Sequence, residues 1–346
     1  MAQKDAHMGL IIRRVLVLNF LMIIFLSSEI LPAGHLNSSN LLPGFKESRY
    51  FNEQILSFSM EPNINVEINA PSPQTFDSNK KVLLIFYATP NMNTIDQTIG
   101  KQMQPGDDWH YNIQNIGAQT RFLRNMIKSE NIIVAYVATG EESWPWWKTR
   151  HNNPDSIILH VVDSVKSIFR DYKVDVALSG HSGGGSFVLG YINAVKEIPN
   201  FIKRISFLDS DYDYDNVLHG EKIIDWLKQS DDHYLSVLAY DDRKVKFDGK
   251  NVVTPTGGTF YKSTLMEEKL STVFNFQTEQ DSLFIKYIAL NGRIKFFLKL
   301  NPDNLMWHTV QVEDNGFIQS IVSGTKYEGI GYSYWGPRAY NQYVQP

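Results

Sequence analysis

Short apolar runs recur along the chain and are separated by stretches in which apolar residues repeat at helical spacing. Residues 81–88 (KVLLIFYA) form a continuous apolar run, which is typical of a strand buried between two layers. Residues 63–70 alternate between apolar and polar, as in a partly exposed strand. Strands are predicted at residues 63–70, 81–88, 132–138, 174–178, 204–208, 234–239 and 293–300.

The stretches between these strands favour helices. Apolar residues repeat every three or four positions across residues 113–127, behind Asp107 and Asp108, which are suitable helix caps. Further helices are predicted at residues 155–169 and 221–228 and within 264–288. Regular alternation of strands and helices predicts an α/β fold, with a mostly parallel sheet covered by helices on both faces.

The first 34 residues differ from the rest of the chain. Arg13 and Arg14 precede an apolar run at residues 15–26, and small residues follow it, which is the order of a secretory signal. We therefore predict a signal peptide or N-terminal anchor at residues 1–34 and a single domain at residues 35–346. Export to the periplasm or the extracellular space is expected, with an uncleaved leader as the membrane-anchored alternative.

Composition and charge exclude several kinds of chemistry. The chain of 346 residues has no cysteine, which excludes a thiol nucleophile and any cysteine-ligated metal. Its 33 Lys and Arg against 37 Asp and Glu give a formal charge of −4, so nucleic acid is not an expected partner. No cofactor is predicted. The acidic run at residues 209–215 departs from the calcium-loop pattern, so no metal is predicted either.

The most informative stretch is residues 174–194 (VDVALSGHSGGGSFVLGYINA), where Gly180, Ser182 and Gly184 stand in GxSxG spacing. A predicted strand precedes this motif and an apolar helix follows it. A serine on such a sharp turn has a strained backbone, and its neighbours two positions away must be small. Amides at the start of the following helix point toward an oxyanion formed there. The pattern indicates a nucleophilic serine.

In this motif the chain resembles the α/β-hydrolase superfamily, and the resemblance extends over residues 81–324. It implies an esterase-like or lipase-like serine hydrolase whose acid and histidine follow the serine along the chain. His308 follows the last strong strand by a short loop, where the superfamily has its general base. Asp242, at the end of the strand at 234–239, is the preferred acid. Asp241 and Asp209 are the alternatives, the latter because some members have the acid one strand earlier.

The loops after two other strands supply the remaining candidates. The oxyanion hole needs two N–H donors: the Gly183 amide is one, and Thr89 or, as an alternative, Asn91 is the other, since Pro90 has no N–H. Three tryptophans follow the strand at 132–138 and are expected to contact substrate in a loop or to pin that loop. They are Trp144, Trp146 and Trp147.

These features predict a secreted serine hydrolase that acts on carboxylic esters, from small molecules or polymers, through an acyl-enzyme on Ser182. A serine peptidase or amidase of the same fold is an alternative because it uses the same groups. A non-catalytic module that binds glycan or a cell-wall component is a second alternative.

Overall fold

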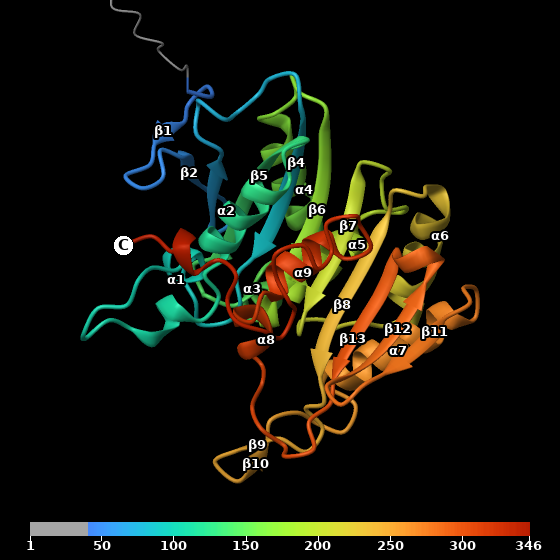
Figure 1. The fold of residues 1–346 in the computed structure, drawn as a ribbon. Coiled ribbons are helices and arrows are strands. Elements are labelled where there is room, and N and C mark those ends of the chain that lie inside the picture. Colours follow the sequence, from blue (N-terminus) through green and yellow to red (C-terminus); the bar gives the residue numbers. More distant parts are fainter. Residues whose placement is uncertain (1–40) are drawn as a thin grey trace, which may run out of the picture. The chain divides into compact units, whose positions relative to one another are not determined.

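The computed structural model describes residues 41–346 (Figure 1). The leader predicted at residues 1–34 lies outside the described residues. Across the part that is described, no helix has the length and apolar character needed to cross a membrane.

One large sheet organises the described residues. Its strand order is β1-β2-β3-β5-β4-β6-β7-β8-β13-β12-β11. The central strands, from β5 to β13, pair in parallel, and antiparallel strands extend the sheet at both edges. The strands are β1 (Lys46–Glu47), β2 (Gln54–Met60), β3 (Ile64–Ala70), β4 (Lys81–Ala88), β5 (Glu130–Thr139), β6 (Val174–His181), β7 (Ile202–Leu208), β8 (Tyr234–Tyr240), β11 (Gln277–Gln280), β12 (Phe284–Ala289) and β13 (Ile294–Lys299).

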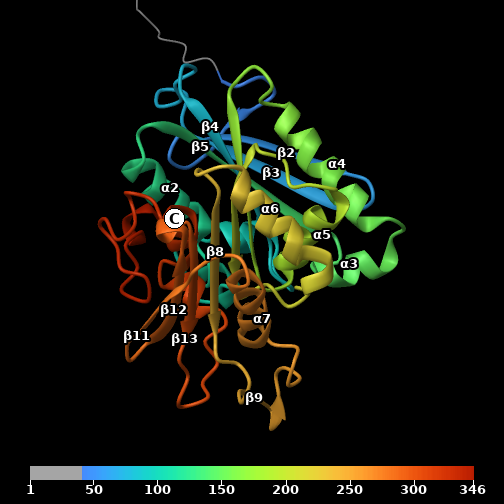
Figure 2. The same cartoon turned by 90° about the vertical axis from the view of Figure 1, so that its right-hand side faces the viewer.

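Helices cover both faces of this sheet, as Figure 2 shows, and each face has its own buried core. One core packs under α3 to α7 and the other under α1, α2 and α9. The helices are α1 (Ile95–Ile99), α2 (Ile116–Met126), α3 (Trp144–Arg150), α4 (Pro154–Ser167), α5 (Gly185–Ala194), α6 (Glu221–Gln229), α7 (Thr259–Ser271), α8 (Val310–Glu313) and α9 (Gly316–Val322). A small hairpin, β9 (Lys246–Phe247) with β10 (Lys250–Asn251), projects from the loop after β8. The predicted α/β class and mostly parallel sheet are confirmed.

The predicted strands are present, with ends shifted by a few residues. The helix predicted within residues 264–288 is α7, which ends at Ser271, and residues 277–280 and 284–289 pair as β11 and β12 beside β13. One prediction of helix caps needs correction. Asp107 and Asp108 do not cap α2, whose N-cap residue is Asn115. The Asp108 carboxylate instead accepts a hydrogen bond from the His110 N–H in a separate short turn.

Candidate active site

Ser182 lies on a sharp turn between β6 and α5. Its φ of 54° is in the left-handed region, which is strained for a serine. The close packing around Gly180 and Gly184 leaves no room for a side chain at either position. A Cβ on Gly180 would lie 2.7 Å from the Gly184 carbonyl carbon, and one on Gly184 would lie 2.2 Å from the Ala88 oxygen. Close packing of the turn against β4 therefore accounts for the GxSxG spacing.

His308 lies in the loop between β13 and α8, and hydrogen bonds hold both its side chain and its backbone. Its Nδ1 donates a hydrogen bond to Oδ2 of Asp209. The buried His181, which directly precedes Ser182, donates from Nε2 to the His308 carbonyl oxygen at 3.0 Å. Burial keeps the pKa of His181 well below its usual value, so this second imidazole is neutral. His308 Nε2 is left available to the pocket.

Asp209 directly follows β7 and is fully buried. Besides the hydrogen bond from His308, its carboxylate accepts one from the Thr259 hydroxyl at the start of α7. Its φ of 48° is also in the left-handed region. Two donors and a constrained backbone thus fix this carboxylate against the imidazole. The acid that contacts His308 is therefore the alternative from one strand earlier.

Asp242, the preferred acid in the sequence, makes no hydrogen bond with His308. Its Oδ2 accepts from the Thr259 N–H at 3.0 Å, and its Oδ1 has no partner within residues 41–346. Burial, with the nearby Asp209 charge, raises the pKa of Asp242 to about 7. Asp241 pairs instead with Arg243 at 2.7 Å. The expectation that Asp242 orients His308 is corrected on this geometry.

Thr89 and Asn91 are the two candidate oxyanion-hole donors after β4, and the preferred one, Thr89, is already engaged. The Thr89 N–H already donates to the Val137 oxygen at 3.0 Å, which continues the pairing of β4 with β5. Asn91 lines the pocket, and its side chain lies against Gly183, where a Cβ would come within 2.0 Å of Asn91 Oδ1. Because the Thr89 N–H is engaged, Asn91, the alternative, remains the candidate donor after β4.

The three tryptophans do not line the pocket. Trp144 and Trp147 are buried in the core and pack edge to face with their ring centres 5.5 Å apart. They occupy positions three apart on α3, so both face the sheet. Trp146 points to solvent and packs against the Arg150 guanidinium at 4.3 Å. The substrate contact expected of these residues is corrected: α3 contributes Pro145 to the pocket instead.

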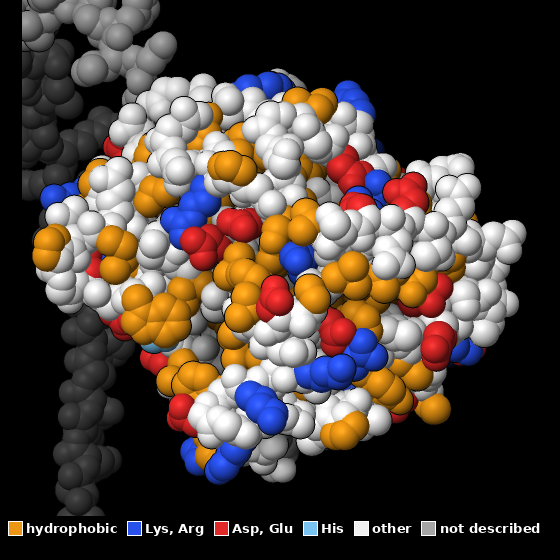
Figure 3. Space-filling model, turned by 60° about the horizontal axis from the view of Figure 1, so that its bottom comes forward, with side chains coloured by type: hydrophobic (Ala, Val, Ile, Leu, Met, Phe, Trp, Pro, Cys, Tyr) orange, Lys and Arg blue, Asp and Glu red, His pale blue; other side chains and the backbone are white. Residues whose placement is uncertain are grey.

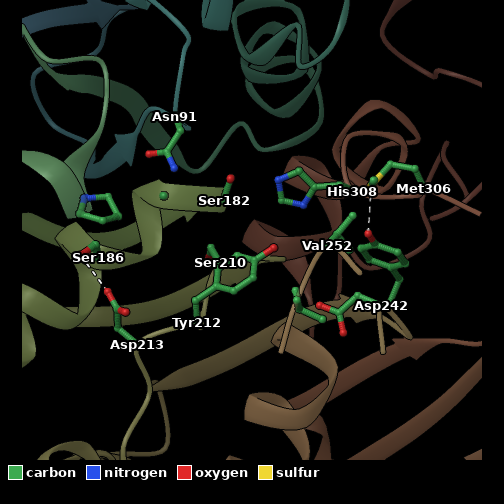
Figure 4. A pocket seen from close by; sticks show the side chains of 14 residues that line it. Asn91, Ser182, Ser186, Ser210, Tyr212, Asp213, Asp242, Val252, Met306 and His308 are labelled. Atoms are coloured by element: carbon green, nitrogen blue, oxygen red, sulfur yellow. Dashed lines mark hydrogen bonds between the residues drawn. The ribbon is translucent and has the colours of Figure 1, made fainter. Parts of the chain in front are cut away.

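A pocket of about 330 Å³ collects these groups at the carboxyl ends of the parallel strands (Figure 4). Figure 4 shows the Ser182 hydroxyl directed toward the His308 ring. On the surrounding face, shown in Figure 3, hydrophobic side chains are spread among acidic and basic ones. The pocket is lined by Asn91, Pro145, Ser182, Gly183, Ser186, Ser210, Tyr212, Asp213, Tyr240, Asp242, Val252, Val253, Met306 and His308.

This arrangement has the parts needed for acyl transfer: a hydroxyl on a strained turn, an imidazole oriented by a buried carboxylate, and N–H donors beside the hydroxyl. The strand order and the helices on both faces fit an α/β-hydrolase fold, and Ser182, Asp209 and His308 follow one another in that order along the sequence. Within residues 41–346, no group of three or more His, Asp or Glu side chains is arranged to hold a metal ion.

Comparison with known proteins finds likeness in structure only. No protein-family model matches the chain, and no curated protein is similar enough in sequence to count as a match. One similar solved structure is a thermostable esterase, with a TM-score of 0.47 and 13% identity over 82% of this chain and 64% of that chain. Another is a mutant of the feruloyl esterase module from Clostridium thermocellum, complexed with sinapinate. It has a TM-score of 0.46 and 13% identity over 84% of this chain and 90% of that chain. A third is the siderophore hydrolase EstA from Aspergillus nidulans, with a TM-score of 0.45 and 12% identity over 79% of this chain and 95% of that chain.

Gly184→Ala tests the packing of the turn. The added methyl meets backbone, which cannot move aside cheaply, so we expect a loss of about 1–3 kcal/mol in unfolding free energy and slower reaction of Ser182 with a fluorophosphonate. Gly190→Ala, in the following helix α5, is the control because its methyl meets only the ends of side chains, those of Ile158, Asp155 and Lys148, and no backbone. Chemical denaturation and labelling rates measure both effects. Equal behaviour of the two variants would show that the close approach to Ala88 is unimportant.

The buried Asp211 predicts a pH dependence of stability. Its Oδ2 accepts from the Ser263 hydroxyl at 2.8 Å, its Oδ1 has no partner within residues 41–346, and burial raises its pKa to about 8. The folded state thus retains a proton that the unfolded chain, with a pKa of about 3.9, releases. Stability is therefore lost as the pH rises from about 4 to about 8.

Asp211→Asn removes this titration and should raise the melting temperature at pH 8.5 by several degrees more than at pH 5. Melting curves at the two pH values test this, with the exposed Asp225→Asn as the control. A difference between Asp211→Asn and wild type that is the same at both pH values would contradict the assignment of a protonated carboxyl.

Proposed function

We propose that this protein is a serine hydrolase of the α/β-hydrolase superfamily that cleaves carboxylic esters through an acyl-enzyme on Ser182. One observation carries the proposal. The pocket contains both the Ser182 hydroxyl and a His308 imidazole whose Nδ1 donates to the buried Asp209. A purely structural serine would need neither the strained φ nor an imidazole held by a buried carboxylate beside it.

In the first half of the reaction, Ser182 Oγ attacks the ester carbonyl carbon while His308 Nε2 takes the hydroxyl proton. The Gly183 N–H and a donor at Asn91 stabilise the negative oxygen of the tetrahedral intermediate. His308 then gives the proton to the alcohol oxygen as the carbon–oxygen bond breaks, which leaves the acyl group on Ser182.

In the second half, His308 takes a proton from a water molecule that attacks the acyl-enzyme, and the proton returns to Ser182 Oγ as the acid leaves. Asp209 does not itself take the proton. It holds the imidazole with the proton on Nδ1 and stabilises the imidazolium that forms in each half. The buried, neutral His181 fixes the His308 backbone and adds no competing charge.

We propose a location outside the cytoplasm because of the sequence pattern of residues 1–34. The basic, apolar and small segments of this leader support export, followed by cleavage or by retention as an anchor. The substrate is then an ester, small or released from a polymer, that reaches the cell envelope or the surroundings.

Labelling with a fluorophosphonate probe tests the nucleophile. Wild type should react stoichiometrically, and peptide mass spectrometry should place the adduct on Ser182. Ser182→Ala should not react, whereas Ser186→Ala, which alters another pocket serine, should still be labelled. An unlabelled wild type with a normal melting curve, or an adduct on another serine, would overturn the proposal.

Paired amide variants test the acid. Asp209→Asn should lower kcat for a p-nitrophenyl ester by about 10³ to 10⁴-fold, because the imidazole loses the partner that sets its tautomer. Asp242→Asn should lower it by less than about tenfold, since no hydrogen bond joins that residue to His308. Turnover of the purified variants is measured at constant pH. The reverse order of the two losses would assign the acid to Asp242.

A further inference from the structure

The pocket around Ser182 and His308 is acidic in a way that the ester chemistry does not require. Two carboxylates, Asp213 and Asp242, line it, and no Lys or Arg is among its lining residues. Neither carboxylate forms an ion pair with any residue in 41–346. The neighbouring Arg243 is already held by Asp241 and packs on the Phe260 ring at 4.3 Å. No direct ion pair within the described chain thus neutralises the two carboxylates, and Arg243 acts on Asp242 only through space.

Asp242 supplies a second, independent observation. Its side chain is 1% exposed, yet Oδ1 lacks any hydrogen-bond donor. Only Oδ2 is satisfied, by the Thr259 N–H. A buried carboxylate oxygen without a donor is costly, and the cost is removed when a donor or a cation binds beside it. Because Asp242 lines the pocket, that donor can come from a ligand.

Asp213 adds a second acceptor in the same pocket. It is exposed, and its Oδ2 accepts from the Ser186 hydroxyl at 3.0 Å. Figure 4 shows the Tyr212 ring between Asp213 and Asp242. An aromatic ring and two carboxylates form a suitable environment for an ammonium group, which offers three N–H donors and a positive charge.

We propose that Asp242 and Asp213 form a subsite that binds an ammonium group on the substrate, so that the preferred substrates are esters of amino-bearing acids or alcohols. This inference rests on the proposed ester hydrolysis and names its substrate class. Esters with an additional carboxylate are disfavoured by the same two side chains, because like charges repel in a partly desolvated pocket.

Matched esters that differ only in terminal charge test this inference. In the acyl series, p-nitrophenyl 6-aminohexanoate carries an ammonium, the heptanoate ester a methyl, and the pimelate half-ester a carboxylate at the corresponding position. In the alcohol series, 4-aminobutyl butanoate is compared with pentyl butanoate. Measurements at pH 8 keep Asp242, whose pKa is about 7, mainly ionised.

In at least one series, kcat/KM should be about tenfold or more higher for the ammonium ester than for its neutral analogue, and the pimelate half-ester should be the poorest of the acyl series. The preference should fall to about threefold or less in Asp242→Asn and should weaken in Asp213→Asn. Asp303→Asn, which removes the same charge from an exposed loop residue outside the pocket, should keep it.

The outcomes separate this inference from the proposed function. Good turnover of the neutral esters with no preference for ammonium in either series would overturn the subsite and leave the hydrolase intact. An equal loss for charged and neutral esters in Asp242→Asn would overturn its role in binding and indicate a role in catalysis. Failure of wild type to cleave any ester, together with failure to label Ser182, would overturn the proposed function itself.

Discussion

Parallel pairing of the central strands is the constraint on which the candidate site depends. Strands β4, β6, β7, β8 and β13 lie in adjacent positions and run in the same direction, so their carboxyl ends meet at one edge of the sheet. The loops after these strands carry Asn91, Ser182, Asp209, Asp242 and His308. The sheet thus brings residues that are far apart in the sequence to the same edge.

At that edge of the sheet, three buried aspartates differ in the number of hydrogen-bond donors that reach each carboxylate. Asp209 accepts side-chain hydrogen bonds from both His308 and Thr259. Asp211 and Asp242 each have one oxygen without a partner among the described residues, and burial raises the pKa of both. The two donors hold Asp209 in place beside the imidazole. Asp242, which lines the pocket, keeps one acceptor without a donor among the described residues.

The sequence predicts much of this arrangement because local signals are strong where the strands are buried. Continuous apolar runs mark β4 and β6, and the glycines around Ser182 mark the turn. The choice between Asp209 and Asp242 was not predictable, because both residues end neighbouring strands and either can face His308. Side-chain rotamers and the position of Thr259, 17 residues beyond Asp242, decide it.

Two other differences have similarly local causes. The pairing of β4 with β5 extends one residue further than the apolar run, which engages the Thr89 N–H and leaves Asn91 at the pocket. The tryptophans after β5 were expected in a loop, and they lie instead on α3, which has Pro145 near its start. Proline is favoured in the first turn of a helix, and spacing of three places Trp144 and Trp147 on the buried face.

A double-mutant cycle between Ser182 and His308 tests most directly whether these residues act as one catalytic unit. Turnover of a neutral p-nitrophenyl ester is measured for Ser182→Ala, His308→Ala and the double variant, with folding checked by circular dichroism. The double variant should be no slower than Ser182→Ala alone, because the imidazole has no function without the hydroxyl. Losses that multiply in the double variant would show that the two side chains act independently and would contradict a single catalytic unit.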